Sequence, residues 1–168
     1  KTLVMHLNIL QHVHRLERNG VDYDTLQIIF TTPSKNLIGQ HERELVPYVE
    51  ALNRRYNNRI DLLIDTTQGL LQQDLDYYEI KDDTTRRLVL VDEGHIGLGS
   101  KGEGEFKKLR DALNARNSFL FEYSATYHNL GSRTIEKEYE QAIVYDYNYS
   151  RFYRDGYGKD YYFKRVGE

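Results

Sequence analysis

The sequence predicts an α/β fold with a mainly parallel sheet that is covered by helices. Three observations predict it. Short apolar stretches of strand length alternate with longer stretches in which apolar residues recur at helical spacing. The stretch 88–91 has four apolar residues in succession, as is typical of a strand buried on both faces. Polar residues typical of turns follow the strand-like stretches.

The periodicity gives the expected order of elements. We expect helices over residues 2–18, 35–56, 68–78 and 105–115, and strands over residues 26–30, 60–64, 88–91, 119–123 and 142–145. In the first helix, the residues near helical spacing are Leu3, Leu7, Leu10 and Val13. Gly20 should end that helix, and Pro47 should kink or split the second one. The glycine-rich stretch 97–104 predicts a mobile loop.

Composition limits the class of protein. A chain of 168 residues with 39% hydrophobic residues is long enough for one compact domain with a real core. The net charge of −3 gives no general basic field, so contact with nucleic acid would need a local patch or backbone and hydroxyl donors. The absence of cysteine excludes disulfides and fits the cytoplasm, where we expect the protein. No apolar run approaches transmembrane length, so we expect no membrane partner.

Two adjacent carboxylates follow the most apolar strand. Asp92 and Glu93 come directly after residues 88–91, and His95 follows Gly94. Ligands of parallel sheets bind at the carboxyl ends of the strands. Two carboxylates there need a positive partner, and a magnesium ion that carries nucleotide phosphates is one. The alternative is a strand that ends in an ordinary polar turn.

The run Asp92-Glu93-Gly94-His95 resembles motif II, the Walker B motif, of superfamily 2 helicases and translocases of the DEAD/DEAH-box type. The resemblance implies that Asp92 holds Mg²⁺, that Glu93 polarises the water attacking the γ-phosphate of ATP, and that His95 links the nucleotide site to the next motif. Gly94 stands where that family usually has alanine, which we expect to change mainly the flexibility of the turn. One helix and one strand later, a tripeptide resembles motif III, which couples the phosphate site to nucleic-acid binding: Ser124, Ala125 and Thr126.

Two further turns match this family in position. The stretch 31–35 looks like motif Ia, and residues 66–68 occupy the place of the next turn that contacts the nucleic-acid backbone. The contacts implied by the resemblance are Thr32, Pro33, Ser34, Lys35, Thr66 and Thr67. Hydroxyls, a lysine and the start of a helix are suitable ligands for phosphates. The alternative for the first turn is an ordinary helix cap with a proline turn.

The first two residues match the end of a phosphate-binding loop. The resemblance implies that Lys1 reaches the β- and γ-phosphates and that Thr2 offers its hydroxyl to Mg²⁺. The glycines of such a loop would lie before Lys1, so we expect the chain to be a piece of a longer protein. If the molecule began at Lys1, its affinity for nucleotide should be very poor.

Together these motifs imply the first RecA-like motor domain, a three-layer αβα P-loop NTPase fold, over residues 1–147. Residues 148–168, rich in Tyr, Arg and Lys, would lead towards a second RecA-like domain. The similarity is strongest to the restriction and phage-defence branch, which includes the Res subunit of type III restriction enzymes.

That branch implies an ATP-dependent DNA helicase or translocase and, as a further partner, a methyltransferase or specificity subunit. Two alternatives stay open: an RNA helicase of the same superfamily, and a non-catalytic nucleic-acid-binding domain that kept the fold. The second motor domain supplies arginines that stabilise the transferring phosphate. We therefore expect negligible ATP hydrolysis by the 168-residue chain alone.

Overall fold

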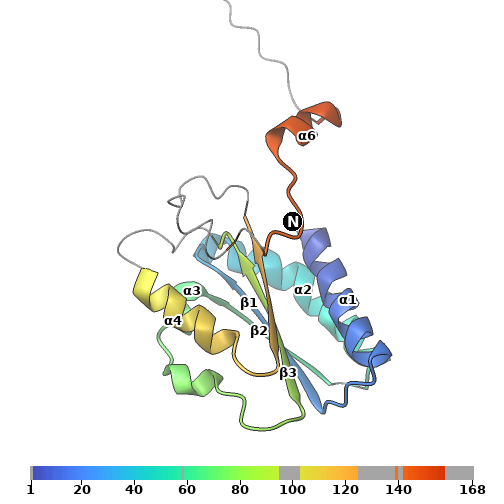
Figure 1. Ribbon diagram of the computed structural model, residues 1–168, viewed down its shortest axis with the longest axis vertical. Helices are drawn as coiled ribbons and strands as arrows, with labels where there is room; N and C mark the ends of the chain where they lie inside the picture. Colours follow the sequence, from blue (N-terminus) through green and yellow to red (C-terminus); the bar gives the residue numbers. More distant parts are fainter. Residues whose placement is uncertain (1, 58, 95–102, 125–138, 140–141, 158–168) are drawn as a thin grey trace, which may run out of the picture. The chain divides into compact units, whose positions relative to one another are not determined.

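The computed structural model describes residues 2–57, 59–94, 103–124, 139 and 142–157. The chain divides into two compact units, Lys1–Leu130 and Gly131–Glu168. The boundary expected from the sequence, after residue 147, falls within the second of these units. The first unit has an α/β fold with a four-stranded, all-parallel sheet (Figure 1).

The strands lie in the order β2-β1-β3-β4. Their bounds are Thr25–Thr32 for β1, Ile60–Thr66 for β2, Thr85–Asp92 for β3 and Ser118–Tyr123 for β4. The last six residues of β3 are buried, which confirms the prediction of a central strand covered on both faces. Because all four strands are parallel, their carboxyl ends lie at one edge of the sheet, here called the carboxyl edge, and their amino ends at the opposite amino edge.

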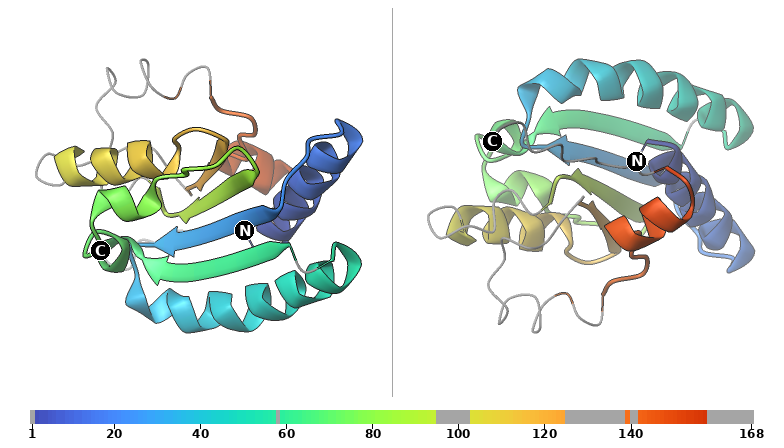
Figure 2. Two further views of the ribbon diagram at one scale, coloured as in Figure 1. Left: turned by 90° about the horizontal axis from the view of Figure 1, so that it is seen from below. Right: turned by 90° about the horizontal axis from the view of Figure 1, so that it is seen from above.

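Helices cover both faces of the sheet, as Figure 2 shows. The bounds are Thr2–Arg18 for α1, Lys35–Arg55 for α2, Thr67–Leu70 for α3 and Glu103–Leu113 for α4, with a 3-10 turn, η1, over Leu75–Tyr78. The helices α1 and α2 pack on one face, and α4 lies on the other together with η1. The core under α1 and α2 is formed by strand residues such as Ile28, Phe30 and Leu90, with Ile9 and Leu45 of the helices.

A buried arginine joins the other face of the sheet to α4. The Arg87 side chain donates two hydrogen bonds to Gln27 Oε1, at 3.1 and 2.9 Å, and one to the carbonyl of Leu113 at 3.5 Å. Leu113 is the last residue of α4. The contact therefore places a positive charge at the negative end of that helix. Burial lowers the pKa of Arg87 from its usual value.

Two predictions about elements are wrong. The helix expected over residues 68–78 is divided into α3 and η1, because the Asp74 side chain accepts a hydrogen bond from the N–H of Asp76 and starts a new turn. Residues 143–148 have no regular structure, so the strand expected over residues 142–145 is absent. Of the two expected effects of Pro47, a kink or a split, the split does not occur, because α2 runs unbroken to Arg55.

The helix α1 is confirmed in its bounds, but not all of its apolar residues are buried. Its inward face is formed by Met5, Ile9, Val13 and Leu16. Leu3 is 71% exposed and Leu7 48% exposed. Apolar residues surround the first half of α1, and periodicity alone does not determine which of them pack on the sheet.

The described part of the second unit contains one short helix, α6, over Tyr149–Arg154. The Asn148 side chain caps it by accepting a hydrogen bond from the N–H of Arg151 at 3.1 Å. Tyr147 donates a hydrogen bond to Asp155 at 2.7 Å, and this bond raises the pKa of Tyr147 to about 12. Over the described residues, every helix is too short or too polar to cross a bilayer.

Candidate functional site

The candidate site lies at the carboxyl edge, around the end of β3. Asp92 is the last residue of β3, and its side chain is only 5% exposed. Its Oδ2 lies 3.4 Å from Nε2 of His41 on α2, and the His41 side chain is equally buried. The ring of His41 packs on Phe30 at a centroid distance of 4.3 Å. The site therefore places a carboxylate and an imidazole together in a buried environment.

His41 was missed in the sequence. It precedes Leu45 by four residues on α2, and so it continues the buried stripe of that helix. The apolar pattern alone assigned this stripe to leucines and valine, because a histidine among them gives no apolar signal. Helical spacing from Leu45 was the one signal that could have found it.

Glu93 adopts a left-handed backbone conformation, with φ of +53°. Such a conformation is uncommon for a non-glycine residue and costs on the order of 1 kcal/mol or more. The N–H of Gly94 donates a hydrogen bond to the carbonyl of Tyr123 at 3.2 Å, so the pairing with β4 continues beyond this turn. The strained residue is the one to which the resemblance assigns activation of water.

Close packing against β4 explains why residue 94 is a glycine. A Cβ at this position would lie 3.3 Å from both Cβ and Oε2 of Glu122 on β4, tighter than ordinary van der Waals contact. Its φ lies outside the left-handed range in which the structure places Gly20 and Gly156. We therefore assign Gly94 a packing role, in which it permits the close approach of β3 and β4, in place of the expected effect on the flexibility of the turn.

The start of α1 lies at the same edge as Asp92. The Asn8 side chain donates a hydrogen bond to the hydroxyl of Tyr123 at 2.7 Å, and Tyr123 is the register partner of Asp92. Burial raises the pKa of Tyr123 to about 12, the bond from Asn8 opposes this, and the Asp92 carboxylate adds to it. Thr2 lies six residues before Asn8, about 9 Å further along the helix axis. The first turn of α1 therefore lies towards the edge at which the strands end (Figure 1).

The turn between β1 and α2 leaves a helix start without a cap. The Ser34 side chain makes no capping hydrogen bond, and the first turn of α2 contains no acidic residue. Lys35, the first residue of α2, is exposed. Thr32 is fully buried, and its hydroxyl accepts a hydrogen bond from the N–H of Ser34 at 3.4 Å. Of the motif Ia residues, Ser34 and Lys35 are therefore better placed than Thr32 to bind a phosphate. Pro33, which lies between Thr32 and Ser34, is partly exposed.

The two threonines after β2 stabilise their own turn. The hydroxyl of Thr66 accepts a hydrogen bond from the N–H of Gly69 at 2.9 Å and so caps α3. The hydroxyl of Thr67 lies 3.2 Å from that of Thr31 at the end of β1. Both threonines are buried. Their contact with nucleic acid stays a prediction, and in this arrangement their hydroxyls join two neighbouring turns.

Ser124 directly follows β4, and so it too lies at the carboxyl edge beside β3. Four predicted site residues lie outside the described residues: Lys1, His95, Ala125 and Thr126. The expected loop over residues 97–104 lies outside them as far as residue 102, and residues 103 and 104 begin α4. The described residues that the structure brings to one edge are thus Asp92, Glu93, Ser124, the turn after β1 and the start of α1.

The donors at this edge suit magnesium. Carboxylate and hydroxyl oxygens, as in Asp92 and Thr2, are its preferred protein ligands. Within the described part of the chain, no group of three or more His, Asp or Glu side chains could hold a metal ion. Magnesium in nucleotide sites is usually bound by one or two protein ligands together with phosphates, so a small donor set fits this type of site better than a metal site made of protein alone.

Comparisons with protein-family models, with curated proteins and with solved structures find no match to this chain.

Proposed function

We propose that this chain is the ATP-binding motor domain, the first RecA-like domain, of an ATP-dependent DNA helicase or translocase of the type III-like restriction or defence kind. The observation that carries the proposal is the placement of the acidic pair. Asp92 and Glu93 end the strand that lies between β1, followed by the Ser34-Lys35 turn, and β4, followed by Ser124. In such a domain, the nucleotide-binding and nucleic-acid-binding turns lie side by side at one edge of a parallel sheet.

Each group has a role that its surroundings support. His41 holds the Asp92 carboxylate in place, and Asp92 with Thr2 would hold Mg²⁺. Bound magnesium would neutralise charge on the triphosphate of ATP. Glu93, partly exposed at the turn, would orient the attacking water. Lys1 would contact the phosphates of ATP, and a second RecA-like domain would complete the site.

Replacement of the proposed water-activating carboxylate tests the catalytic part. In a protein that contains both motor domains, Glu93→Gln should abolish ATP hydrolysis and leave ATP binding intact, because the amide keeps the shape and loses the charge. Unchanged turnover would contradict the role given to Glu93. Stimulation of the wild-type protein by DNA but not by RNA would support the DNA-directed form of the proposal. The 168-residue chain alone should hydrolyse ATP negligibly, because an arginine supplied in trans contributes about 10³–10⁵ in rate.

Salt-dependent DNA binding tests the nucleic-acid part. Lys35 lies at the uncapped start of α2, whereas Lys81 is exposed in the loop before β3, away from the carboxyl edge. In a fluorescence anisotropy titration, Lys35→Gln should lower the slope of log affinity against log salt by about one, the value for one lost phosphate contact. Lys81→Gln is the matched control and should leave the slope unchanged. Equal effects of the two variants would show non-specific attraction and contradict the proposed contact.

A further inference from the structure

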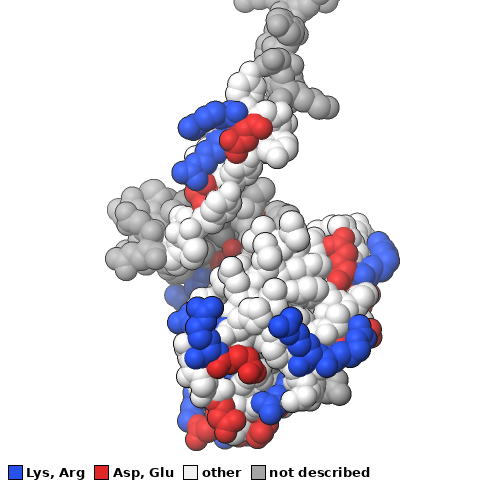
Figure 3. Space-filling model, turned by 90° about the vertical axis from the view of Figure 1, so that its right-hand side faces the viewer, with Lys and Arg blue, Asp and Glu red and all other residues white. Residues whose placement is uncertain are grey.

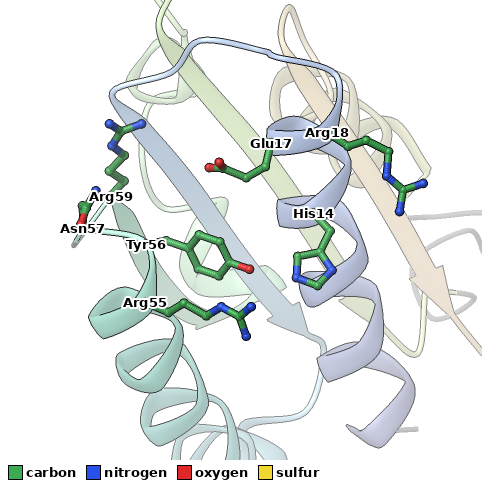
Figure 4. A pocket seen from close by; sticks show the side chains of 7 residues that line it. All are labelled: His14, Glu17, Arg18, Arg55, Tyr56, Asn57 and Arg59. Atoms are coloured by element: carbon green, nitrogen blue, oxygen red, sulfur yellow. The ribbon is translucent and has the colours of Figure 1, made fainter.

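A polar pocket lies at the amino edge, opposite to the candidate site. It has a volume of about 600 Å³ and lies between the last turns of α1 and α2 and the start of β2 (Figure 4). His14 and Glu17 extend from α1 into the space between the helices, and Arg55 and Tyr56 extend towards them from α2. An eight-residue strand separates the two edges by about 26 Å, so this pocket is distinct from the surroundings of Asp92.

Two arginines of this pocket are held by aromatic rings. The guanidinium carbon of Arg55 lies 5.7 Å from the ring centroid of Tyr56, and that of Arg59 lies 5.7 Å from the ring centroid of Tyr23. Arg59 also donates one hydrogen bond to the carbonyl of Tyr23 at 3.2 Å. Cation–π contact fixes a guanidinium without using its N–H donors. Both arginines are therefore oriented in advance and keep donors for a ligand.

Among the described residues, neither Arg55 nor Arg59 forms a salt bridge. The carboxylate that lines the pocket, Glu17, accepts a hydrogen bond from the Tyr23 hydroxyl at 3.2 Å. Burial and the Glu17 carboxylate raise the pKa of Tyr23 to about 12, so this hydroxyl keeps its proton at neutral pH.

The turn that carries Arg59 is fixed by its own hydrogen bonds. The Asn53 side chain accepts a hydrogen bond from the N–H of Ile60 at 2.8 Å and donates one to the carbonyl of Ile60 at 2.7 Å. Asn57 takes the left-handed conformation after the end of α2, with φ of +59°. The carbonyl of Arg59 accepts a hydrogen bond from the N–H of Leu26 at 2.7 Å. The backbone of the pocket is therefore tied to β1 and to α2 before any ligand binds.

Compensation of the helix ends does not alone account for the positive charge of the arginines in this pocket. An α-helix C-terminus carries about half a negative charge, and one nearby cation is sufficient to compensate it. Three arginines line the pocket: Arg18 from the last turn of α1, Arg55 from the last turn of α2, and Arg59 from the turn before β2. By contrast, residues 2–14 of α1 carry no Asp, Glu, Lys or Arg, and Figure 3 shows basic and acidic side chains together below an uncharged region.

We propose that this pocket binds the phosphate groups of one ligand through Arg55 and Arg59, whose guanidinium groups lie apart with the Tyr56 ring between them (Figure 4), while Tyr56 and Tyr23 contact the two guanidinium groups. The planar guanidinium fork matches the oxygens of a phosphate, which makes phosphate the favoured anion. The phosphate is carried either by a small phosphorylated molecule or by a nucleic-acid strand. The proposal is independent of the motor function, because none of these residues lies at the carboxyl edge.

Titration of the chain with inorganic pyrophosphate tests the proposal. We expect saturable binding that weakens about tenfold in Arg55→Gln and in Arg59→Gln, the loss typical of one charge-assisted hydrogen bond. Arg54→Gln is the matched control, because Arg54 neighbours Arg55 on α2 but does not line the pocket. It should bind pyrophosphate as tightly as the wild type. Urea unfolding of each variant verifies that it is folded.

Further arms of the experiment separate the alternatives. An oligothymidylate that displaces pyrophosphate and is weakened by Arg55→Gln identifies a nucleic-acid strand as the carrier, whereas one that does not displace it identifies a small ligand. Absence of saturable binding at millimolar pyrophosphate, or an equal loss in Arg54→Gln, would overturn the proposal.

Discussion

The pair formed by Asp92 and His41 predicts an asymmetry between two substitutions that is measurable in the chain itself. Both side chains are 5% exposed, and Oδ2 of Asp92 lies 3.4 Å from Nε2 of His41. Removing one partner of a buried pair strands the other charge and costs about 3–5 kcal/mol. His41→Leu should leave the Asp92 carboxylate without its imidazole partner. It also removes Nδ1 of His41, which is buried without a hydrogen-bond partner among the described residues, and this offsets about 1 kcal/mol. We expect a net loss of about 2–4 kcal/mol in the free energy of unfolding.

Asp92→Asn should behave differently. The amide keeps the shape of the side chain and removes the charge whose burial is unfavourable, so the free energy of unfolding should change by no more than about 1 kcal/mol. The double variant should be more stable than His41→Leu alone by about 2 kcal/mol, because no charge is left to strand. Urea unfolding at pH 7 measures all three. A large loss of unfolding free energy in Asp92→Asn together with a small loss in His41→Leu would show that the Asp92 carboxylate stabilises the fold. That result would contradict the claim that its burial is unfavourable.

Two further predictions concern the polar edges of the fold. A Cβ at Gly69 would overlap the carboxylate of Asp65, so Gly69→Ala should lower the free energy of unfolding by about 1–3 kcal/mol. Adding Asp65→Ala should restore most of this stability, and a loss that Asp65→Ala does not reduce would contradict the proposed overlap. Burial, with a smaller contribution from Arg15, lowers the pKa of His12 below its usual value of 6.5, so its contribution to stability is present above pH 6.5 and lost as the pH falls below it. The melting temperature should therefore fall between pH 7.5 and pH 5.5, and by less in His12→Gln; an equal fall in both would contradict the assignment.

The parts of the fold that the sequence predicted are those set by local patterns. The run Leu88–Val91 needs no partner to be identified as a buried strand, and the structure buries it completely. The end of α1 follows from Gly20, which takes the left-handed conformation with φ of +60°. The parallel arrangement follows from the alternation of strands and helices. These features depend on a few neighbouring residues, so one sequence is sufficient to find them.

The remaining features depend on contacts between distant segments. Periodicity finds apolar residues on α1 but not that Met5 is buried while Leu3 is exposed, because the sheet decides which face packs. The division of the third helix depends on Asp74, whose side chain competes with continued helix. His41 meets Asp92 only because α2 lies over the end of β3. The sequence could place Asp92 at a strand end, but it could not supply this partner.

The polarity of the helices distinguishes the two proposed sites. At the carboxyl edge, α1 and α2 begin, and neither has an acidic residue in its first turn, where acidic residues are favoured. The positive helix ends there are left for a ligand, but Asp92 and Glu93 would repel a bare phosphate. Binding of a triphosphate at this edge should therefore require a divalent cation. At the amino edge, Arg55 and Arg59 provide the positive charge, and no cation is needed.

Binding with and without magnesium tests this difference. In a chain that also carries the predicted phosphate-binding loop, ATP binding should be strong in Mg²⁺, weak in excess EDTA, and at least about tenfold weaker in Asp92→Asn, as for a lost charged contact. Pyrophosphate binding that is sensitive to Arg55→Gln should persist in EDTA. ATP binding that is equal in EDTA and Mg²⁺ and indifferent to Asp92→Asn would show that the acidic pair holds no metal-bound phosphate. The motor proposal would then fail, and the arginine pocket, tested by its own variants, would be unaffected.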